Sequence, residues 1–318
     1  MECSMTAKDV QEILKFRRTP GYSPFRTRHL KISRSWKPML PYWLPLIQPD
    51  QLRSLSIHDS QYSEFVMTSD WLSSPSSPMF LNLLSLTVDR VQIRDWKRLK
   101  HFLSRCPVIR IVQIRNVPAD LGDITTEAIS IPTLRALYAS ANVDLIIPFT
   151  NGTEILEHVH FGAATSYLTW HAVQVLQGNG QMIQSLCFAI TDIDAGHDPI
   201  ELLMSFPNLK TLELGFSNPK RKSEFINYVY DLLESPAGLL PSTLEHLAIK
   251  FSATDGLPWQ ETFRPLVLDH SWSINFPRLC YLEIDERNGL AFRYDHVRGR
   301  VLKEVQLWDD VVQYQLGS

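Results

Sequence analysis

The chain has few cysteines and glycines for its length, and it lacks long apolar runs. Its four cysteines, among 318 residues, lie far apart and form no CxxC pair, which favours reduced thiols over a disulfide framework or a zinc knuckle. Only 13 glycines are present, too few to favour a nucleotide-binding fold. The apolar runs are shorter than the roughly 18 residues that span a bilayer, and the N-terminal segment has no apolar signal core. We therefore expect a cytoplasmic or nuclear protein without a membrane partner.

An excess of one charge sign is also missing. The net charge is -3, from 31 Lys and Arg against 34 Asp and Glu, whereas a dedicated nucleic-acid binder usually carries a basic stripe. The sequence contains no GxSxG, HExxH or P-loop motif. These absences predict a protein that is no enzyme, holds no cofactor and does not bind nucleic acid. Hydrophobic residues make up 44% of the chain, enough for a large core.

The chain does contain a short pattern that recurs. An aliphatic residue is followed by two free positions, a second aliphatic, one free position and a third, as in FPNLKTLELGF at 206–216 and FPRLCYLEIDE at 276–286. The copies begin at Leu52, Leu83, Ile109, Leu134, Leu156, Ile183, Leu209, Leu244, Leu279 and Leu302, with a degenerate copy at 27–32. The starts are about 22 to 35 residues apart, which is the range of a solenoid repeat.

Each copy predicts one short strand. Its last two aliphatics are two residues apart, so their side chains share one face of the strand. A strand of this kind buries its apolar face by stacking beside the next, which yields a parallel sheet. Helices are predicted between strands at 96–107, 165–180, 198–207 and 223–236, the last two with Asp198 and Ser223 as N-caps. The predicted class is therefore an α/β solenoid.

These motifs, above all FPNLKTLEL, STLEHLAI, FPRLCYLEI and LKEVQLWDD, resemble leucine-rich repeats. They are similar in particular to the irregular repeats that follow the F-box in fungal F-box proteins. The resemblance covers about residues 25 to 310 and implies a right-handed horseshoe of about 10–11 repeats, with a concave parallel sheet and irregular convex helices. We expect residues 1–24 to form an N-terminal helical cap or linker and residues 25–318 to form the repeat domain.

The same resemblance implies a non-catalytic protein-interaction module, the substrate-recognition region of an SCF-type E3 ubiquitin ligase adaptor. In that family the F-box docks on a Skp1-type adaptor. No F-box is recognisable here, because the first repeat begins near residue 27. The chain is then a fragment, has lost its F-box or has no adaptor role, and a Skp1-type partner is expected only if an F-box lies upstream. The alternative is a free-standing leucine-rich-repeat scaffold unrelated to ubiquitin.

Residues that flank the buried aliphatics point to the concave face of such a solenoid and are candidate contacts to a protein partner. The candidates are Arg115, Tyr138, His158, His160, Glu213, Tyr281, Glu283, Asp285 and Trp308. Further residues on this face are His29, Lys31, His58, Asp89, His246, Lys250 and Glu304. The simpler interpretation of each is a polar residue that faces water.

Three of the flanking residues suggest chemistry of their own. His158 and His160 share one strand face, but their spacing offers no third ligand, so no metal site is predicted. Cys187, between Leu186 and Phe188, is expected to be exposed on the concave side, most simply as an inert filler.

Overall fold

The computed structural model describes residues 2–4, 26–33, 48–58, 79–90, 96–115, 129–140, 149–150, 153, 155–162, 166–190, 198–217, 222–234, 239–252, 275–286, 292–295 and 300–301. The chain forms two compact units. Unit 1 comprises Met1–Ile155 and Val311–Ser318, and unit 2 comprises Leu156–Asp310. The boundary between them falls within the predicted repeat domain, 25–318, whose limits stay a prediction.

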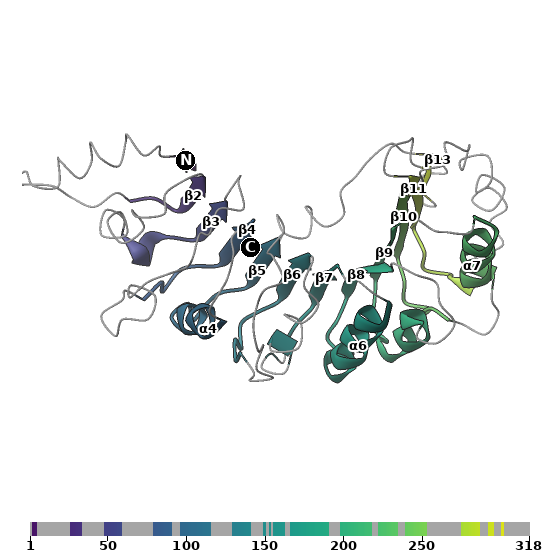
Figure 1. Cartoon of the computed structure of the whole chain (residues 1–318), viewed down its shortest axis with the longest axis horizontal. Helices are drawn as coiled ribbons and strands as arrows, with labels where there is room; N and C mark the ends of the chain where they lie inside the picture. Colours follow the sequence, from purple (N-terminus) through teal and green to yellow (C-terminus); the bar gives the residue numbers. More distant parts are fainter. Residues whose placement is uncertain are drawn as a thin grey trace, which may run out of the picture. The chain divides into compact units, whose positions relative to one another are not determined.

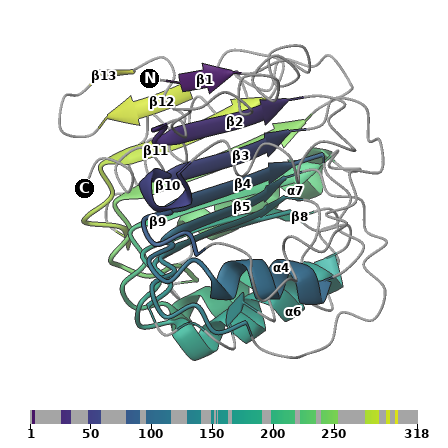
Figure 2. The same ribbon diagram turned by 90° about the vertical axis from the view of Figure 1, so that its left-hand side faces the viewer.

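Unit 1 contains a sheet whose strands follow one another in chain order, side by side (Figure 1). The strands are β1 (Glu2–Ser4), β2 (His29–Ser33), β3 (Ser54–His58), β4 (Ser85–Asp89), β5 (Ile111–Arg115) and β6 (Ala136–Ser140). Each strand pairs in parallel with the next. The 3-10 helix η2 (Pro49–Gln51) precedes β3, and helix α4 (Trp96–Ser104) lies along one side of the sheet in Figure 2.

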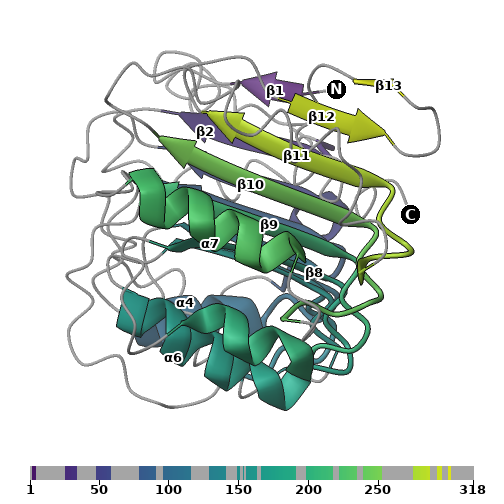
Figure 3. The ribbon, with the colours of Figure 1, turned by 90° about the vertical axis from the view of Figure 1, so that its right-hand side faces the viewer.

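Unit 2 repeats this architecture. Its parallel strands, again in chain order, are β7 (His158–Phe161), β8 (Ser185–Ile190), β9 (Thr211–Ser217), β10 (His246–Ser252) and β11 (Tyr281–Glu286). Two antiparallel strands, β12 (Phe292–Asp295) and β13 (Arg300–Val301), extend the sheet beyond β11. The helices between strands are α6 (Ser166–Leu176), η4 (Gln177–Asn179), η5 (Pro199–Ser205) and α7 (Lys222–Glu234). Figure 3 shows α6 and α7 on the same side of these strands.

The strand register aligns the repeated aliphatic positions. Within each unit, the second aliphatic of each repeat pairs with its counterpart in the next strand, and none of these residues exposes more than 2% of its surface. These residues are Leu30, Leu55, Leu86, Val112 and Leu137 in unit 1, and Val159, Leu186, Leu212, Leu247 and Leu282 in unit 2. The predicted α/β class and the open parallel sheet of stacked repeats are thus confirmed, and the sheet is compatible with a repeat solenoid.

The recurring apolar–Pro–x–aliphatic sequence forms the turn that leads to four of the strands. The N–H of Leu209 donates to the carbonyl of Phe206 across 3.0 Å, and Leu279 bonds to Phe276 in the same way. The sequences that begin at Cys106 and Ile131 form the same turn. Proline occupies the second position, where its fixed φ favours a turn, and the apolar residue before it is buried.

Phenylalanine side chains of α7 and α4 pack against the residues next to these helices. Phe225 of α7 packs against Phe216 of β9 and Phe251 of β10, with ring centroids 4.9 and 5.3 Å apart. In unit 1, Phe102 of α4 lies 5.3 Å from Phe80. Phe225 thus links α7 to two strands, and Phe102 packs α4 against the turn that precedes β4; replacing a fully buried phenylalanine by alanine typically costs about 3 to 5 kcal/mol.

The predicted helices differ from the observed ones in detail. Asp198 is an N-cap as expected, since its Oδ1 accepts from the N–H of Ile200 at 2.9 Å, but the helix that follows is 3-10. Ser223 is not an N-cap, because α7 already begins at Lys222. Of residues 1–24, expected to form a helical cap or linker, Glu2–Ser4 form strand β1 and the others lie outside the described residues, as does the copy that begins at Leu302. No helix in the described part of the chain has the length and apolarity of a membrane span.

Candidate protein-interaction surface

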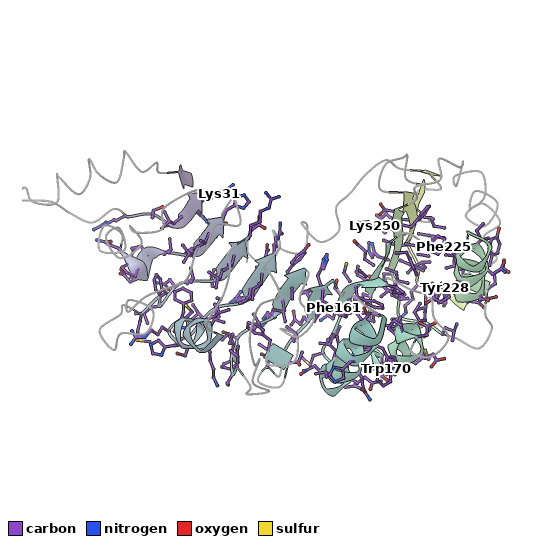
Figure 4. All side chains as sticks on the ribbon, in the orientation of Figure 1. Lys31, Phe161, Trp170, Phe225, Tyr228 and Lys250 are labelled. Atoms are coloured by element: carbon purple, nitrogen blue, oxygen red, sulfur yellow. The ribbon has the colours of Figure 1, made fainter. Side chains whose placement is uncertain are left out.

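In each unit, the helices that the structure describes lie on one face of the sheet and leave the other face uncovered. We call it the open face and define it by the strand residues that alternate with the buried aliphatics. In Figure 4, Lys250 lies on the side of β10 away from α7, whereas Phe225 and Tyr228 lie on the α7 side. Alternation along a strand makes this separation necessary, because side chains at neighbouring positions point to opposite faces.

The open face of unit 2 carries an aromatic pair. His246 of β10 and Tyr281 of β11 are register partners, and their rings stack with centroids 4.6 Å apart and planes 21° apart. His158 occupies the same register position on β7, where its Nε2 lies 3.8 Å from the Glu157 carboxylate. Cross-strand pairs of this kind hold their partners in fixed positions.

A charged pair lies next to it. Lys250 Nζ is 3.0 Å from the Glu213 carboxylate, and both side chains are largely buried, at 22% and 15% exposure. Burial, which lowers the pKa of Lys250, is outweighed by the attraction of Glu213 and then of Glu283, so this pKa is raised above its usual value. The register places Ala248 between Glu213 and Glu283, and its small side chain leaves the lysine room between the two carboxylates.

Cys187 and Glu283 are on the predicted face but are not exposed. Each exposes only 6% of its surface, so the expectation of an exposed Cys187 is wrong. Cys187 lies in register between His160 and Glu213, whose longer side chains reach past the short thiol. Another cysteine, Cys106, belongs to the core of unit 1, where burial raises its pKa to about 12.

The open face of unit 1 pairs charges and rings along neighbouring strands. The Arg115 guanidinium lies 4.7 Å from the centre of the Tyr138 ring, at a cation–π distance. His58 Nδ1 lies 2.6 Å from Asp89 Oδ2, on the register neighbour of Arg115. Gln113 is almost fully buried, at 4% exposure, between these strands. A half-buried, mixed-charge surface results.

The predicted site residues thus divide between the units. Arg115 and Tyr138 lie in unit 1, and the other described candidates, His158, His160, Glu213, Tyr281, Glu283 and Asp285, lie in unit 2. Asp285 pairs in register with Lys250, and Trp308 lies outside the described residues. Among the described residues no three His, Cys, Asp or Glu side chains are grouped so that they could hold a metal ion.

Sequence reasoning missed a set of hydrogen bonds between consecutive repeats. The residue before the first aliphatic of a repeat donates its side-chain hydrogen bond to a turn carbonyl of the preceding repeat. The donors are Asn82, Thr133, Asn208 and Thr243, and their carbonyl partners are Asp50, Ile109, Gln181 and Leu209 at 2.5 to 2.8 Å. The recurrence of Asn or Thr at this one repeat position was the signal that could have revealed them.

Comparison with known proteins adds no relative. No protein-family model, curated protein or solved structure matches the chain. The function is therefore inferred from the two sheets and from the side chains that they position.

Proposed function

We propose that the chain is a non-catalytic protein-interaction module that binds a protein partner through its open faces. The observation that supports this proposal is the fixed, in-register arrangement of large side chains on a sheet face that no described helix covers, above all the His246–Tyr281 stack beside the Glu213–Lys250 pair. Aromatic and charged side chains that are already ordered lose little conformational entropy on binding. They are therefore effective contacts in protein interfaces.

The mixed charge of this face favours a protein over a nucleic acid. Two carboxylates, Glu213 and Glu283, act on Lys250, and Asp89 pairs with His58 in unit 1. A phosphate backbone would meet repulsion at each of these carboxylates. A protein surface can offer both signs of charge and apolar contacts to the rings.

The repeat family and the specific cellular role of the chain are also part of the proposal, and they are supported by the sequence resemblance alone. The repeats are leucine-rich repeats in a right-handed horseshoe, and the open faces are its concave side. In the leading version the chain recognises substrates for an SCF-type ubiquitin ligase in the cytoplasm or nucleus. In the alternative version it is a leucine-rich-repeat scaffold with no ubiquitin link.

Site-specific photo-crosslinking tests the binding face. A photoreactive phenylalanine replaces Tyr138 or Tyr281 on the open faces, and Tyr230 of α7 is the control on the helix side. Irradiation in cells of the source organism should give one discrete protein adduct from the open-face positions, and Glu213→Lys should abolish the adduct from position 281. Adducts of equal yield from position 230, or none from positions 138 and 281, would contradict the proposal.

A second experiment separates the two versions. The full gene product is used to capture purified Skp1-type adaptor, with the 318-residue chain as the comparison. Capture by either supports the ligase version. If neither captures the adaptor while the open-face crosslink persists, the scaffold version is correct.

A further inference from the structure

A row of arginines marks the start of the strands in unit 1. The residue that precedes each strand donates its backbone N–H to the carbonyl of its counterpart one repeat earlier. These hydrogen bonds link Arg28, Arg53, Leu84, Arg110 and Arg135 in order, at 2.7 to 2.9 Å. We call these five residues the strand-start row. Adjacent members are one strand spacing apart, about 4.8 Å, so four guanidinium groups lie along one edge of one sheet.

Three of the four arginines of this row are available to a ligand, and the fourth, Arg135, already interacts with another residue. Arg28 and Arg53 are exposed, and Arg110 is half-buried. None of these three forms an ion pair with another residue that the structure describes. Among the described residues of the turns that lead to β3, β4, β5 and β6, one carboxylate is present, that of Asp50. Its Oδ2 accepts a hydrogen bond from Gln51 Nε2 at 3.1 Å.

The gap in the row is apolar. Leu84 replaces the arginine before β4, and the turn that leads to it carries Met79 and Leu81, which are 50% and 48% exposed. Arg105 lies beside them, because its carbonyl accepts the N–H of Phe80 at 3.1 Å. An apolar patch thus sits between two pairs of positive charges.

Unit 2 has the same backbone row with different chemistry. There the linked residues are Glu157, Gln184, Lys210, Glu245 and Cys280. Exposed methionines, Met182 and Met204, occur in this unit as well, so the arginines are what distinguishes unit 1. The whole units follow the same trend, with 19 Lys and Arg against 14 Asp and Glu in unit 1, and 12 against 20 in unit 2.

We propose that the strand-start row of unit 1, together with Met79 and Leu81, binds an extended acidic segment of a partner protein. Carboxylates of the segment pair with the guanidinium groups, which suit them because they donate two parallel hydrogen bonds. An apolar side chain of the segment covers Met79 and Leu81. The row lies at the strand starts, outside the residues that define the open face, so this inference goes beyond the proposed function and gives the chemistry of a second contact with a partner.

A nucleic acid fits this edge less well. Single-stranded nucleic acids use aromatic side chains on which bases stack. The row contains no aromatic residue, and Phe80, in the neighbouring turn, is buried at 1% exposure. Two exposed apolar side chains between the charges suit an extended peptide with acidic residues at every second position and an apolar residue in place of the central one, because side chains at i, i+2 and i+4 share one face.

Fluorescence anisotropy with the full chain tests the proposal. The probe is a short labelled peptide with Glu, Glu, Leu, Glu and Glu at every second position and Ser between them. Arg53→Glu combined with Arg110→Glu should weaken binding about tenfold or more, and higher salt should weaken binding to the wild type. Lys210→Glu, the charge reversal at the equivalent position of unit 2, should change affinity less than about twofold. Arg53→Gln with Arg110→Gln repeats the test with smaller changes, and circular dichroism checks that each variant is folded.

The apolar part of the site has its own control. Leu81→Ser should weaken binding of the peptide with the central Leu and leave binding of a matched peptide with Gly in place of that Leu unchanged. The proposal would be overturned if Lys210→Glu lowered the peptide affinity as much as the double Arg→Glu variant does. It would also be overturned if neither the double Arg→Glu nor the double Arg→Gln variant lowered that affinity. Tighter binding of oligothymidylate that is insensitive to Leu81→Ser would also overturn it and would identify a nucleic-acid site. If peptide binding fails while the crosslinks from positions 138 and 281 persist, the proposed function stands without this segment.

Discussion

Thr243 of one repeat holds the turn of the preceding repeat through Leu209. Its Oγ1 donates to the carbonyl of Leu209 at 2.8 Å and also lies 3.0 Å from the carbonyl of Pro207. Thr133 makes the same pair of contacts in unit 1, to Ile109 and Pro107. The stacking of repeats therefore depends on side-chain hydrogen bonds at the turns as well as on the buried aliphatics.

Thr243→Val should destabilise the protein by about 1 kcal/mol, because it removes the hydroxyl and keeps the side-chain shape. Thr243→Ser retains the hydroxyl and should recover most of the loss. Urea unfolding monitored by circular dichroism measures both variants. Equal stability of the valine and serine variants would show that the hydroxyl contributes nothing.

Gly180 is required by a close approach of two turns. A Cβ at this position would overlap the carbonyl oxygen of Ser205 and would lie 3.1 Å from that of Gln177. Gly180→Ala should therefore cost about 1 to 3 kcal/mol in unfolding free energy. Gly178→Ala is the matched control, since a Cβ there meets no atom within 4 Å, and it should be neutral or slightly stabilising. A Gly180 variant as stable as the Gly178 variant would contradict this packing.

Asp198 caps η5, but burial of its carboxylate disfavours the charged form. Tyr228 donates to its Oδ1 at 3.1 Å, and burial raises the pKa of Asp198 despite the hydrogen bonds from Ile200 and Tyr228. Burial, together with the negative charge of Asp198, also raises the pKa of Tyr228 well above its usual value. A raised carboxyl pKa in the folded state means that this group stabilises the fold below its unfolded pKa of about 3.9, and that the contribution is lost as pH rises through the folded pKa.

Asp198→Asn should match or exceed the wild-type stability at neutral pH, because the amide still accepts from Ile200 and carries no buried charge. Asp198→Ala should lose about 1 kcal/mol with the cap. Thermal melting at acidic and neutral pH gives the comparison. The advantage of the asparagine variant over the wild type should grow as pH rises and should disappear in acid. A constant difference would mean that the carboxyl pKa is not raised.

The strands were predictable because one spacing determines both burial and pairing. Leu212 and Leu214 are two residues apart, which places them on one strand face, and recurrence of that spacing requires neighbouring strands to stack in register. The helix over 96–107 was predictable for a similar reason, since Leu99, Phe102 and Leu103 share a face and are all buried in α4. The antiparallel strands β12 and β13 follow no such repeat, and nothing in their sequence predicted them.

The sequence predicted which strand face the candidate site occupies, but not which of its side chains are exposed or paired. Alternation placed Cys187 and Glu283 on the open face correctly, but exposure depends on the lengths of side chains on adjacent strands, which one strand's sequence does not contain. The Glu213–Lys250 pair is diagonal, since Glu213 pairs in register with Ala248. This contact depends on the register between two repeats whose starts lie 35 residues apart. The sequence therefore identified both residues as residues of this face but did not predict that they form a pair.

The Glu213–Lys250 pair should couple energetically in unit 2. Its Nζ–carboxylate distance is 3.0 Å, and because both side chains are largely buried, solvent screens them less than a surface pair. A double-mutant cycle with Glu213→Gln and Lys250→Met should give a coupling of about 1 kcal/mol, and Lys210→Met should couple with Glu213→Gln by less than about 0.5 kcal/mol. Since the pKa of Lys250 is raised, its contribution is fully present below the unfolded lysine pKa of about 10.4 and is lost as pH rises through the folded value. Urea unfolding at neutral pH measures the cycle, and equal coupling for Lys250 and Lys210 would contradict the pairing.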